Sequence, residues 1–179
     1  YNSDLWARVN YVNYMSGGSP YMPDTIGLNV PIELSMAFHT DAGYRATEEL
    51  IGTLSICSTH FFDGKTRNGQ DRFASYDLAS LLINGLQQDM GEDFNWQVRS
   101  IWNRNYCETR EAQVPSALLE MLSHQNFADM RHAYDPKFKF QFCRSVYKTI
   151  VKYLATQHQT DYVIQPLPVH NFAVTLNED

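Results

Sequence analysis

The sequence predicts an α/β domain built on a mainly parallel sheet with helices on both faces. Three short apolar segments, residues 30–38, 53–62 and 114–121, have the length and bounding turns of buried strands. Helical segments separate them, and such alternation is typical of a layered fold with parallel strands. With 179 residues, of which 44% are hydrophobic and 19% charged, the chain has the size and composition of one globular domain.

The first predicted element is a helix over residues 1–15. Ser3 or Asp4 can cap its start, and the glycines and proline of residues 16–20 end it. Since the chain opens directly on a capped helix, we expect the first part of the fold to lie upstream of Tyr1. The apolar stripe along this helix consists of Leu5, Val9 and Val12.

The predicted strand at residues 30–38 runs directly into His39 and a polar, glycine-containing turn. Side chains alternate between the two faces of a strand, so His39 shares its face with Glu33. In α/β proteins, ligands bind at the carboxyl ends of strands. A histidine there can offer a ring nitrogen to a metal ion, but a lone strand-end histidine is also commonly structural, and the two interpretations stay open.

The middle of the chain is predicted to hold a strand, a loop and a helix. Residues 53–62 have strand composition, and the glycine-containing loop 63–69 ends the strand. Ser75 is the expected N-cap of a helix that reaches about residue 90, and short extended pieces are expected in residues 91–110. The inward-facing positions of this helix are Leu78, Leu81, Leu82 and Leu86.

The strand predicted at residues 114–121 runs into Glu120, and a carboxylate at the end of a central strand is costly to bury unless another group pairs with it. A helical turn or two is expected at residues 127–132. The longest helix follows, with Asp135 as its N-cap, Pro136 in its first turn and apolar residues at every fourth position.

A domain boundary is predicted near Asp161, so that residues 1–160 form the main domain. Prolines stiffen residues 165–169 into a linker, and residues 171–176 alternate like the start of a new β-strand. Residues 161–179 are therefore expected to hold a linker and the beginning of a second module.

Composition and charge argue against several classes of partner. The net charge of −6 disfavours binding to a phosphate backbone, so no nucleic-acid partner is expected. No apolar run approaches the ~20 residues that a bilayer span needs, and no signal-peptide pattern stands at Tyr1. Cys57, Cys107 and Cys143 form no C-x-x-C pair, which favours three small buried hydrophobic side chains. The oligomeric state is left open.

His39 and Glu120 together suggest a hydrolytic zinc site. Each stands at the end of an apolar strand, and if the strands are neighbours the two side chains meet at one edge of the sheet. In hydrolytic zinc sites, three protein ligands leave a fourth position for water, and a nearby free Glu takes the proton of that water. Spacing alone does not establish that the two residues meet.

Other candidate side chains have simpler interpretations. Glu33 is expected to be a strand-edge carboxylate rather than a further ligand, and His60 a surface or packing residue. His124 lies four residues after Glu120, but the preceding apolar run favours strand and loop over the helix that a ligand pair at this spacing needs. An aromatic cluster that could stack on sugars, but is more often core, consists of Trp96, Trp102 and Tyr106.

The order of several motifs resembles the zinc-dependent N-acetylmuramoyl-L-alanine amidases, which hydrolyse peptidoglycan. That family has a strand ending in Ser-x-His-x-Asn-Ala, and residues 37–42 are Ala-Phe-His-Thr-Asp-Ala. The family also has a Leu-Arg, then Pro-Ala-x-Leu-x-Glu and an Asn six residues later. Here Thr109-Arg110 precede Pro-Ser-Ala-Leu-Leu-Glu at residues 115–120, and Asn126 follows.

The resemblance covers roughly residues 5–154 and is greatest with secreted Bacteroidetes members labelled xanthan lyase-like. It implies that His39 ligates zinc and that Glu120 acts as general base on the metal-bound water and then protonates the leaving amine. Arg110 could pair with Glu120 or with a substrate carboxylate, and Asp41 could hold the His39 ring as an acceptor.

Two departures qualify the resemblance. The family's other zinc ligands, a His in an Asp-Pro-Gly-His-Gly-type loop and a Glu, precede its first matching helix, so they are expected upstream of Tyr1. Ala37, Asp41 and Leu122-Ser123 also differ from the family pattern.

The resemblance as a whole implies a secreted, periplasmic or cell-envelope zinc hydrolase that cleaves the amide between N-acetylmuramic acid and L-alanine in peptidoglycan or muropeptides. The alternative is a non-catalytic module that binds cell wall or glycan. The tail resembles the entry to a fibronectin type III-like module.

Overall fold

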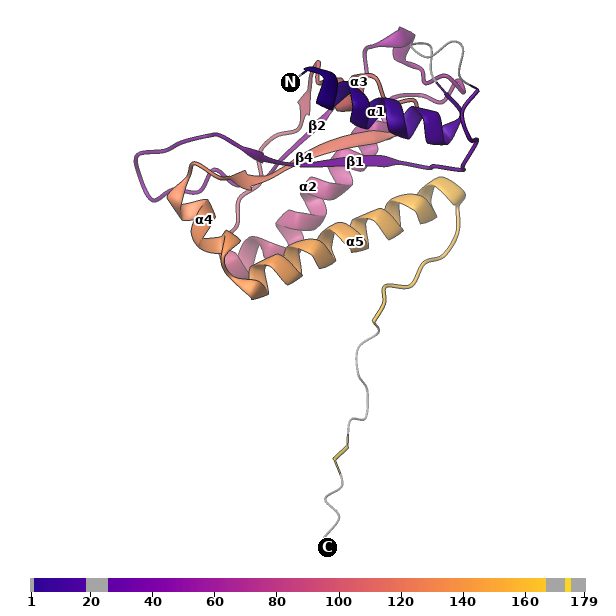
Figure 1. Cartoon of the computed structure of the whole chain (residues 1–179). Helices are drawn as coiled ribbons and strands as arrows, with labels where there is room; N and C mark the ends of the chain where they lie inside the picture. Colours follow the sequence, from indigo (N-terminus) through magenta and orange to yellow (C-terminus); the bar gives the residue numbers. More distant parts are fainter. Residues whose placement is uncertain (1, 19–25, 167–172, 175–179) are drawn as a thin grey trace, which may run out of the picture.

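The computed structural model describes residues 2–18, 26–166 and 173–174, and its centre is a four-stranded sheet with helices on both faces (Figure 1). The sheet consists of β1 (Ser35–Asp41), β2 (Leu54–Cys57), β3 (Trp102–Asn103) and β4 (Ser116–Ser123). Its strand order is β1-β4-β2-β3. The pairs β1–β4 and β2–β3 are parallel, and only β2–β4 is antiparallel. The predicted fold class, a mainly parallel sheet between helices, is confirmed.

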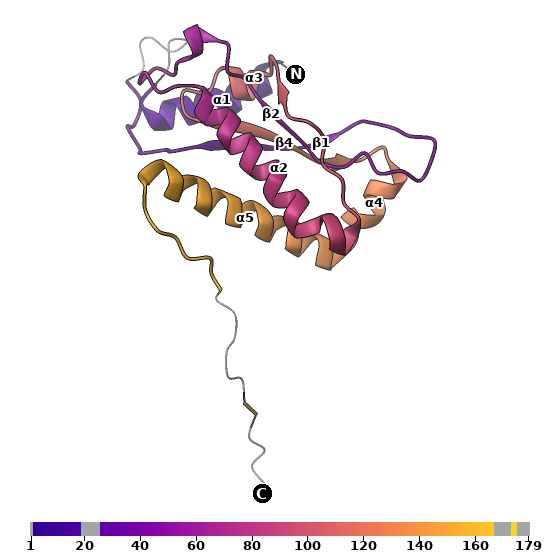
Figure 2. The same cartoon turned by 180° about the vertical axis from the view of Figure 1, so that it is seen from behind.

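The helices form two layers. On one face lie α1 (Asn2–Ser16) and the single turn α3 (Cys107–Arg110); on the other, α2 (Phe73–Phe94) packs against α5 (Pro136–His158) (Figures 1 and 2). The short helix α4 (Phe127–Ala133) follows β4 and contacts α5, and a 3-10 turn spans Phe62–Gly64. In the part of the chain that the structure describes, no helix is both long and apolar enough to cross a membrane.

The main core lies between the sheet and the layer of α2 and α5. Leu78, Leu82 and Leu86 of α2 are fully buried there, as the helical spacing predicted, and Phe138 and Phe142 of α5 face them. A smaller cluster on the opposite face consists of Leu54, Ile56 and Leu118, with Ala37, Trp102 and Tyr106 packed against it.

The two strands that carry the candidate residues extend beyond their predicted ends. β1 begins at Ser35 because β4, its partner strand among the described residues, begins at Ser116, the residue that pairs with Ser35. Both strands continue past the expected ends, to Asp41 and Ser123. His39 therefore lies inside a strand, followed by a bulge before Asp41, and does not close the strand as predicted.

Two predicted helix caps are wrong. α1 already begins at Asn2, ahead of both expected caps. α2 begins at Phe73, and the Asp71 carboxylate accepts the Phe73 N–H at 2.9 Å, so Ser75 lies inside the first turn. The Ser75 hydroxyl accepts the Ser116 N–H instead and joins α2 to β4. The cap of α5 is confirmed, because the Asp135 carboxylate accepts the Lys137 N–H at 2.8 Å.

The three cysteines differ in burial. Cys57 is buried, and burial raises the pKa of its thiol to about 11, but Cys143 is exposed, so the expectation of three buried cysteines was wrong.

The tail follows α5 without regular structure over residues 161–166. Arg144 of α5 donates to the carbonyl of Gln165 at 3.0 Å. The strand expected at residues 171–176 lies outside the described residues apart from 173–174.

Candidate functional site

The structure brings His39 and Glu120 side by side. They are direct partners in the parallel pair β1–β4, so their side chains leave the same face of the sheet. The preceding partners, Ala37 and Leu118, pack in the smaller cluster, which places His39 and Glu120 on the face covered by α1 and α3. The sequence predicted that the two residues would meet if their strands were neighbours, and the strands are neighbours.

The His39 ring lies against a carboxylate from α3. Its Nε2 is 2.8 Å from Oε2 of Glu108, an ion-pair distance, although the two atoms are not aligned as a hydrogen bond. Glu108 is 9% exposed and also approaches Arg8 of α1, with 3.4 Å between Oε1 and Nη1. Arg8 in turn pairs with Asp4 at 2.7 Å. A line of alternating charges thus runs from the surface of α1 to His39.

Glu120 is a partly buried carboxylate in a field of mixed sign. Burial raises its pKa above the ordinary value; the His39 ring and Arg99 lower this pKa, whereas the carboxylates of Asp41 and Glu108 raise it further. Its Oε2 is buried and has no hydrogen-bond partner among the described residues. A raised pKa makes the carboxylate a stronger base, which suits it to accept a proton and return it.

Asp41 faces an arginine that the sequence analysis did not single out. Its Oδ2 lies 2.8 Å from Nη1 of Arg99, and its Oδ1 accepts the N–H of Ala42 at 2.7 Å. These are the partners of the Asp41 carboxylate, so its expected role as an acceptor for the His39 ring stays a prediction.

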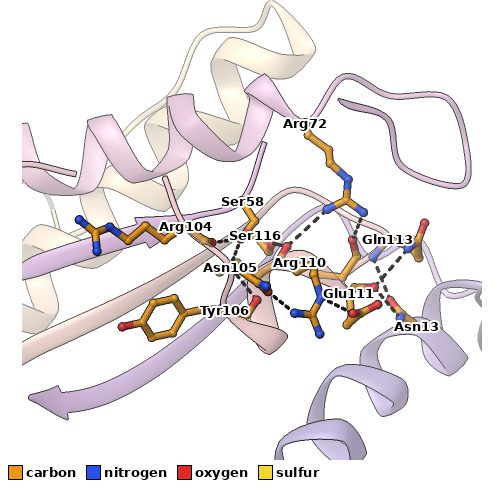
Figure 3. A network of polar contacts seen from close by, with 12 residues as sticks. Asn13, Ser58, Arg72, Arg104, Asn105, Tyr106, Arg110, Glu111, Gln113 and Ser116 are labelled. Atoms are coloured by element: carbon orange, nitrogen blue, oxygen red, sulfur yellow. Dashed lines mark hydrogen bonds and ion pairs between the residues drawn. The ribbon is translucent and has the colours of Figure 1, made fainter. Parts of the chain in front are cut away.

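Arg110 belongs to a separate polar network near the start of β4 (Figure 3). Its guanidinium donates to Glu111 and to the side chain of Asn105. The same group lies 6.0 Å from the ring centroid of Trp6 and 5.7 Å from that of Phe61. The structure gives it these partners in place of Glu120, and its expected contact with a substrate carboxylate stays a prediction.

The side chains with simpler interpretations lie apart from His39 and Glu120. Glu33 pairs with His158 at the end of α5, and His60 is exposed beside Asn103. His124 Nδ1 is 3.1 Å from the hydroxyl of Thr40, which is on the strand face opposite His39. Trp96 is a core residue whose indole N–H donates to the hydroxyl of Thr53.

The described residues fit a zinc site only in part. The Nε2 of His39 is a buried nitrogen without a hydrogen bond, as a metal ligand would be. Zinc needs at least three protein ligands, however, and no three His, Cys, Asp or Glu side chains of the described residues are grouped to hold a metal ion. This part of the chain therefore does not form a zinc centre by itself.

A cavity of about 230 Å³ leads to the site between α1 and β1. Arg8, Glu108 and His39 line its polar side, and Val9 and Phe38 are among its apolar residues. Phe38 is 50% exposed although it is in a strand. The His39 ring therefore borders a cavity, although its Nε2 is buried.

Glu108 and Arg99 are the residues that the sequence analysis missed. Glu108 stands on a single helical turn, which is too short to show a periodic pattern. Arg99 lies in an irregular segment next to an isolated bridge between Thr53 and Val98. The only signal at Glu108 is its place two residues before Arg110, in the stretch that resembles the amidase motif.

Comparison with known proteins identifies the fold. No protein-family model matches the sequence, and no curated protein matches it. Among solved structures, an N-acetylmuramoyl-L-alanine amidase from Clostridium difficile 630 superposes with a TM-score of 0.62 at 16% identity, covering 86% of this chain and 66% of the amidase chain. The chain shares the fold of this amidase.

Two further amidases support the assignment. The CwlD amidase from Clostridioides difficile, solved with the GerS lipoprotein, gives a TM-score of 0.61 at 15% identity over 87% of this chain and 64% of its own. The catalytic domain of the amidase CwlV from Bacillus (Paenibacillus) polymyxa var. colistinus gives 0.52 at 15% identity over 83% of this chain and 82% of its own. The chain thus spans slightly less than two thirds of the two Clostridium amidases. Identities this low establish the amidase fold alone.

Proposed function

We propose that this chain is part of an amidase that hydrolyses the amide bond between N-acetylmuramic acid and L-alanine in peptidoglycan. The observation that carries the proposal is the pairing of His39 with Glu120 across neighbouring strands of an amidase-like sheet. At that place the buried Nε2 of His39 and Oε2 of Glu120 have no hydrogen-bond partner among the described residues. Unpaired buried donors and acceptors cost stability, and they are kept at sites that bind or react.

Glu120 would carry the proton in this reaction. Its carboxylate takes a proton from the attacking water, the water oxygen bonds to the carbonyl carbon, and the C–N bond breaks as the same proton passes to the leaving amine. The burial that raises the pKa of Glu120 brings it closer to the working pH of such a base and acid. Zinc is the metal implied by the resemblance: His39 would supply one ligand, and the others would come from outside the described residues.

A peptidoglycan substrate places the protein outside the cytoplasm, in the cell envelope or secreted. Arg110 would bind a substrate carboxylate, and Asp41 would orient the His39 ring. By the resemblance to the xanthan lyase-like members, residues 161–179 would hold a proline linker and the start of a fibronectin type III-like module.

The test is hydrolysis of defined muropeptides by the longest natural form that carries this chain. We expect a new free amino terminus on L-alanine, and loss of this product in Glu120→Gln with the fold retained. Glu92→Gln, which removes an exposed carboxylate of α2, is the matched control and should leave the product unchanged. His39→Ala should lower the zinc content per chain. Equal activity of Glu120→Gln and the wild type would contradict the proposal.

The ion pair between His39 and Glu108 favours a second candidate, a non-catalytic module that binds cell wall. The Glu108 carboxylate lies against the nitrogen that a metal would need. In that case the protein sediments with purified peptidoglycan, chelators and His39→Ala leave the binding unchanged, and no amide is cleaved. Release of L-alanine amino termini would decide against this candidate.

A further inference from the structure

Arg99 reaches the site from the edge of the sheet opposite β1. Its main-chain N–H donates to the carbonyl of Thr53, just before β2, at 2.8 Å. Its guanidinium pairs with Asp41 at the end of β1. Because β4 and β2 lie between these segments in the strand order, the side chain spans the strand that carries Glu120.

The contact with Asp41 uses only one nitrogen of Arg99. Nε and Nη2 are buried, and no atom of the described residues accepts a hydrogen bond from them. Glu120 has a buried Oε2 that accepts no hydrogen bond from the described residues. Thr53, which accepts the Arg99 N–H, precedes Leu54, the partner of Glu120 across β2 and β4, so the guanidinium crosses the sheet near Glu120 although the two side chains form no direct ion pair. Its positive charge favours the ionised carboxylate.

We propose that Arg99 is the positioning residue of Glu120: anchored on Asp41, its guanidinium fixes the orientation of the Glu120 carboxylate at the site. The effect of Arg99 on catalysis rests on the proposed amidase function. The side chains of Arg99 and Asp41 are 26% and 29% exposed, so water screens the guanidinium only in part, and an arginine held at one end by Asp41 restrains a carboxylate without covering it. Arg99 itself does not touch the reacting atoms.

The kinetic test separates positioning from folding. Arg99→Gln removes the charge, whereas Arg99→Lys keeps it on a different head group. We expect Arg99→Gln to lower kcat by about tenfold or more with KM changed less than about threefold, and Arg99→Lys to recover part of the loss. The control is Arg104→Gln, since the Arg104 guanidinium is exposed and stacks on Trp102 at 4.6 Å. A Lys variant as impaired as the Gln variant, or a loss confined to KM, would overturn the proposal.

A second measurement does not depend on activity. In a side-chain ¹⁵N–¹H spectrum, the Nε–H signal of Arg99 is assigned by its loss in Arg99→Lys. We expect this signal to shift in Glu120→Gln, while the Arg104 signal stays in place. No shift would overturn the proposal even in an active enzyme. If the wild type releases no L-alanine amino terminus, the amidase function fails, and the spectrum alone decides whether Arg99 holds Glu120.

Discussion

The start and the middle of β4 use buried polar groups in opposite ways. At the start of the strand, Arg72 is 1% exposed and donates to the main-chain carbonyls of Lys65, Thr109 and Ala112. The Ser116 N–H and hydroxyl are bonded there as well. Four residues further on, buried atoms of Glu120 and of its neighbours His39 and Arg99 lack hydrogen-bond partners among the described residues.

This difference separates groups that hold the fold together from groups that are available for chemistry. A buried charge that is bonded to main-chain carbonyls stabilises the native state, because its removal strands several acceptors. A buried polar atom without a hydrogen bond costs stability, and a protein keeps such an atom where it binds or reacts. Substitutions of the bonded groups at the start of β4 and of Glu120 should therefore change the free energy of unfolding in opposite directions.

The largest effect is expected at Arg72. Arg72→Met keeps much of the side-chain volume but leaves the carbonyls of Lys65, Thr109 and Ala112 without this donor. We expect the free energy of unfolding to fall by about 3 kcal/mol or more, measured by urea denaturation. The matched control is Arg104→Gln, an exposed arginine, which should stay within about 0.5 kcal/mol. A loss below about 1 kcal/mol at Arg72 would break the comparison.

Asp129 tests whether a fully bonded carboxylate at the other end of β4 also stabilises the fold. It is completely buried and accepts the main-chain N–H groups of Ile51, Gly52 and Ser123 at 2.9, 3.1 and 2.8 Å. Asp129→Ala strands all three donors, and we expect a loss of about 2–3 kcal/mol in the same urea experiment. A neutral result would show that position along the strand matters more than bonding.

The sequence predicted the fold better than the surroundings of the site. α5 followed from Asp135 and Pro136, because local capping chemistry decides where a helix begins. The ends of β1 were misplaced, because the partner strand decides which residues pair. His39 and Glu120 could be singled out from their motifs. Glu108 and Arg99 could not, because they reach the site from a single helical turn and an irregular segment that show no pattern.

Glu120 itself should stabilise the protein when it is neutralised. Burial raises its folded-state pKa, whereas the unfolded chain ionises near 4.5. Below pH 4.5 the group is protonated in both states and costs nothing; as the pH rises through the folded pKa, wild type loses stability and Glu120→Gln does not. The difference in free energy of unfolding between the variant and wild type should therefore grow from pH 4 to pH 7, measured with EDTA present. An equal difference at both pH values would mean that neighbouring groups already offset the cost of burying the ionised Glu120 carboxylate.

The smallest effect is expected at an ion pair that is well formed but exposed. Nη2 of Arg131 lies 2.9 Å from Oε1 of Glu48, and the two side chains are 55% and 76% exposed. Water and salt screen such a pair, so Arg131→Gln should change the free energy of unfolding by about 0.5 kcal/mol or less, and added salt should reduce even that. The pair resembles Arg99 and Asp41 in distance and differs from it in exposure. A loss above about 1 kcal/mol would mean that pairing, rather than burial, sets the energetic difference between the start of β4 and Glu120.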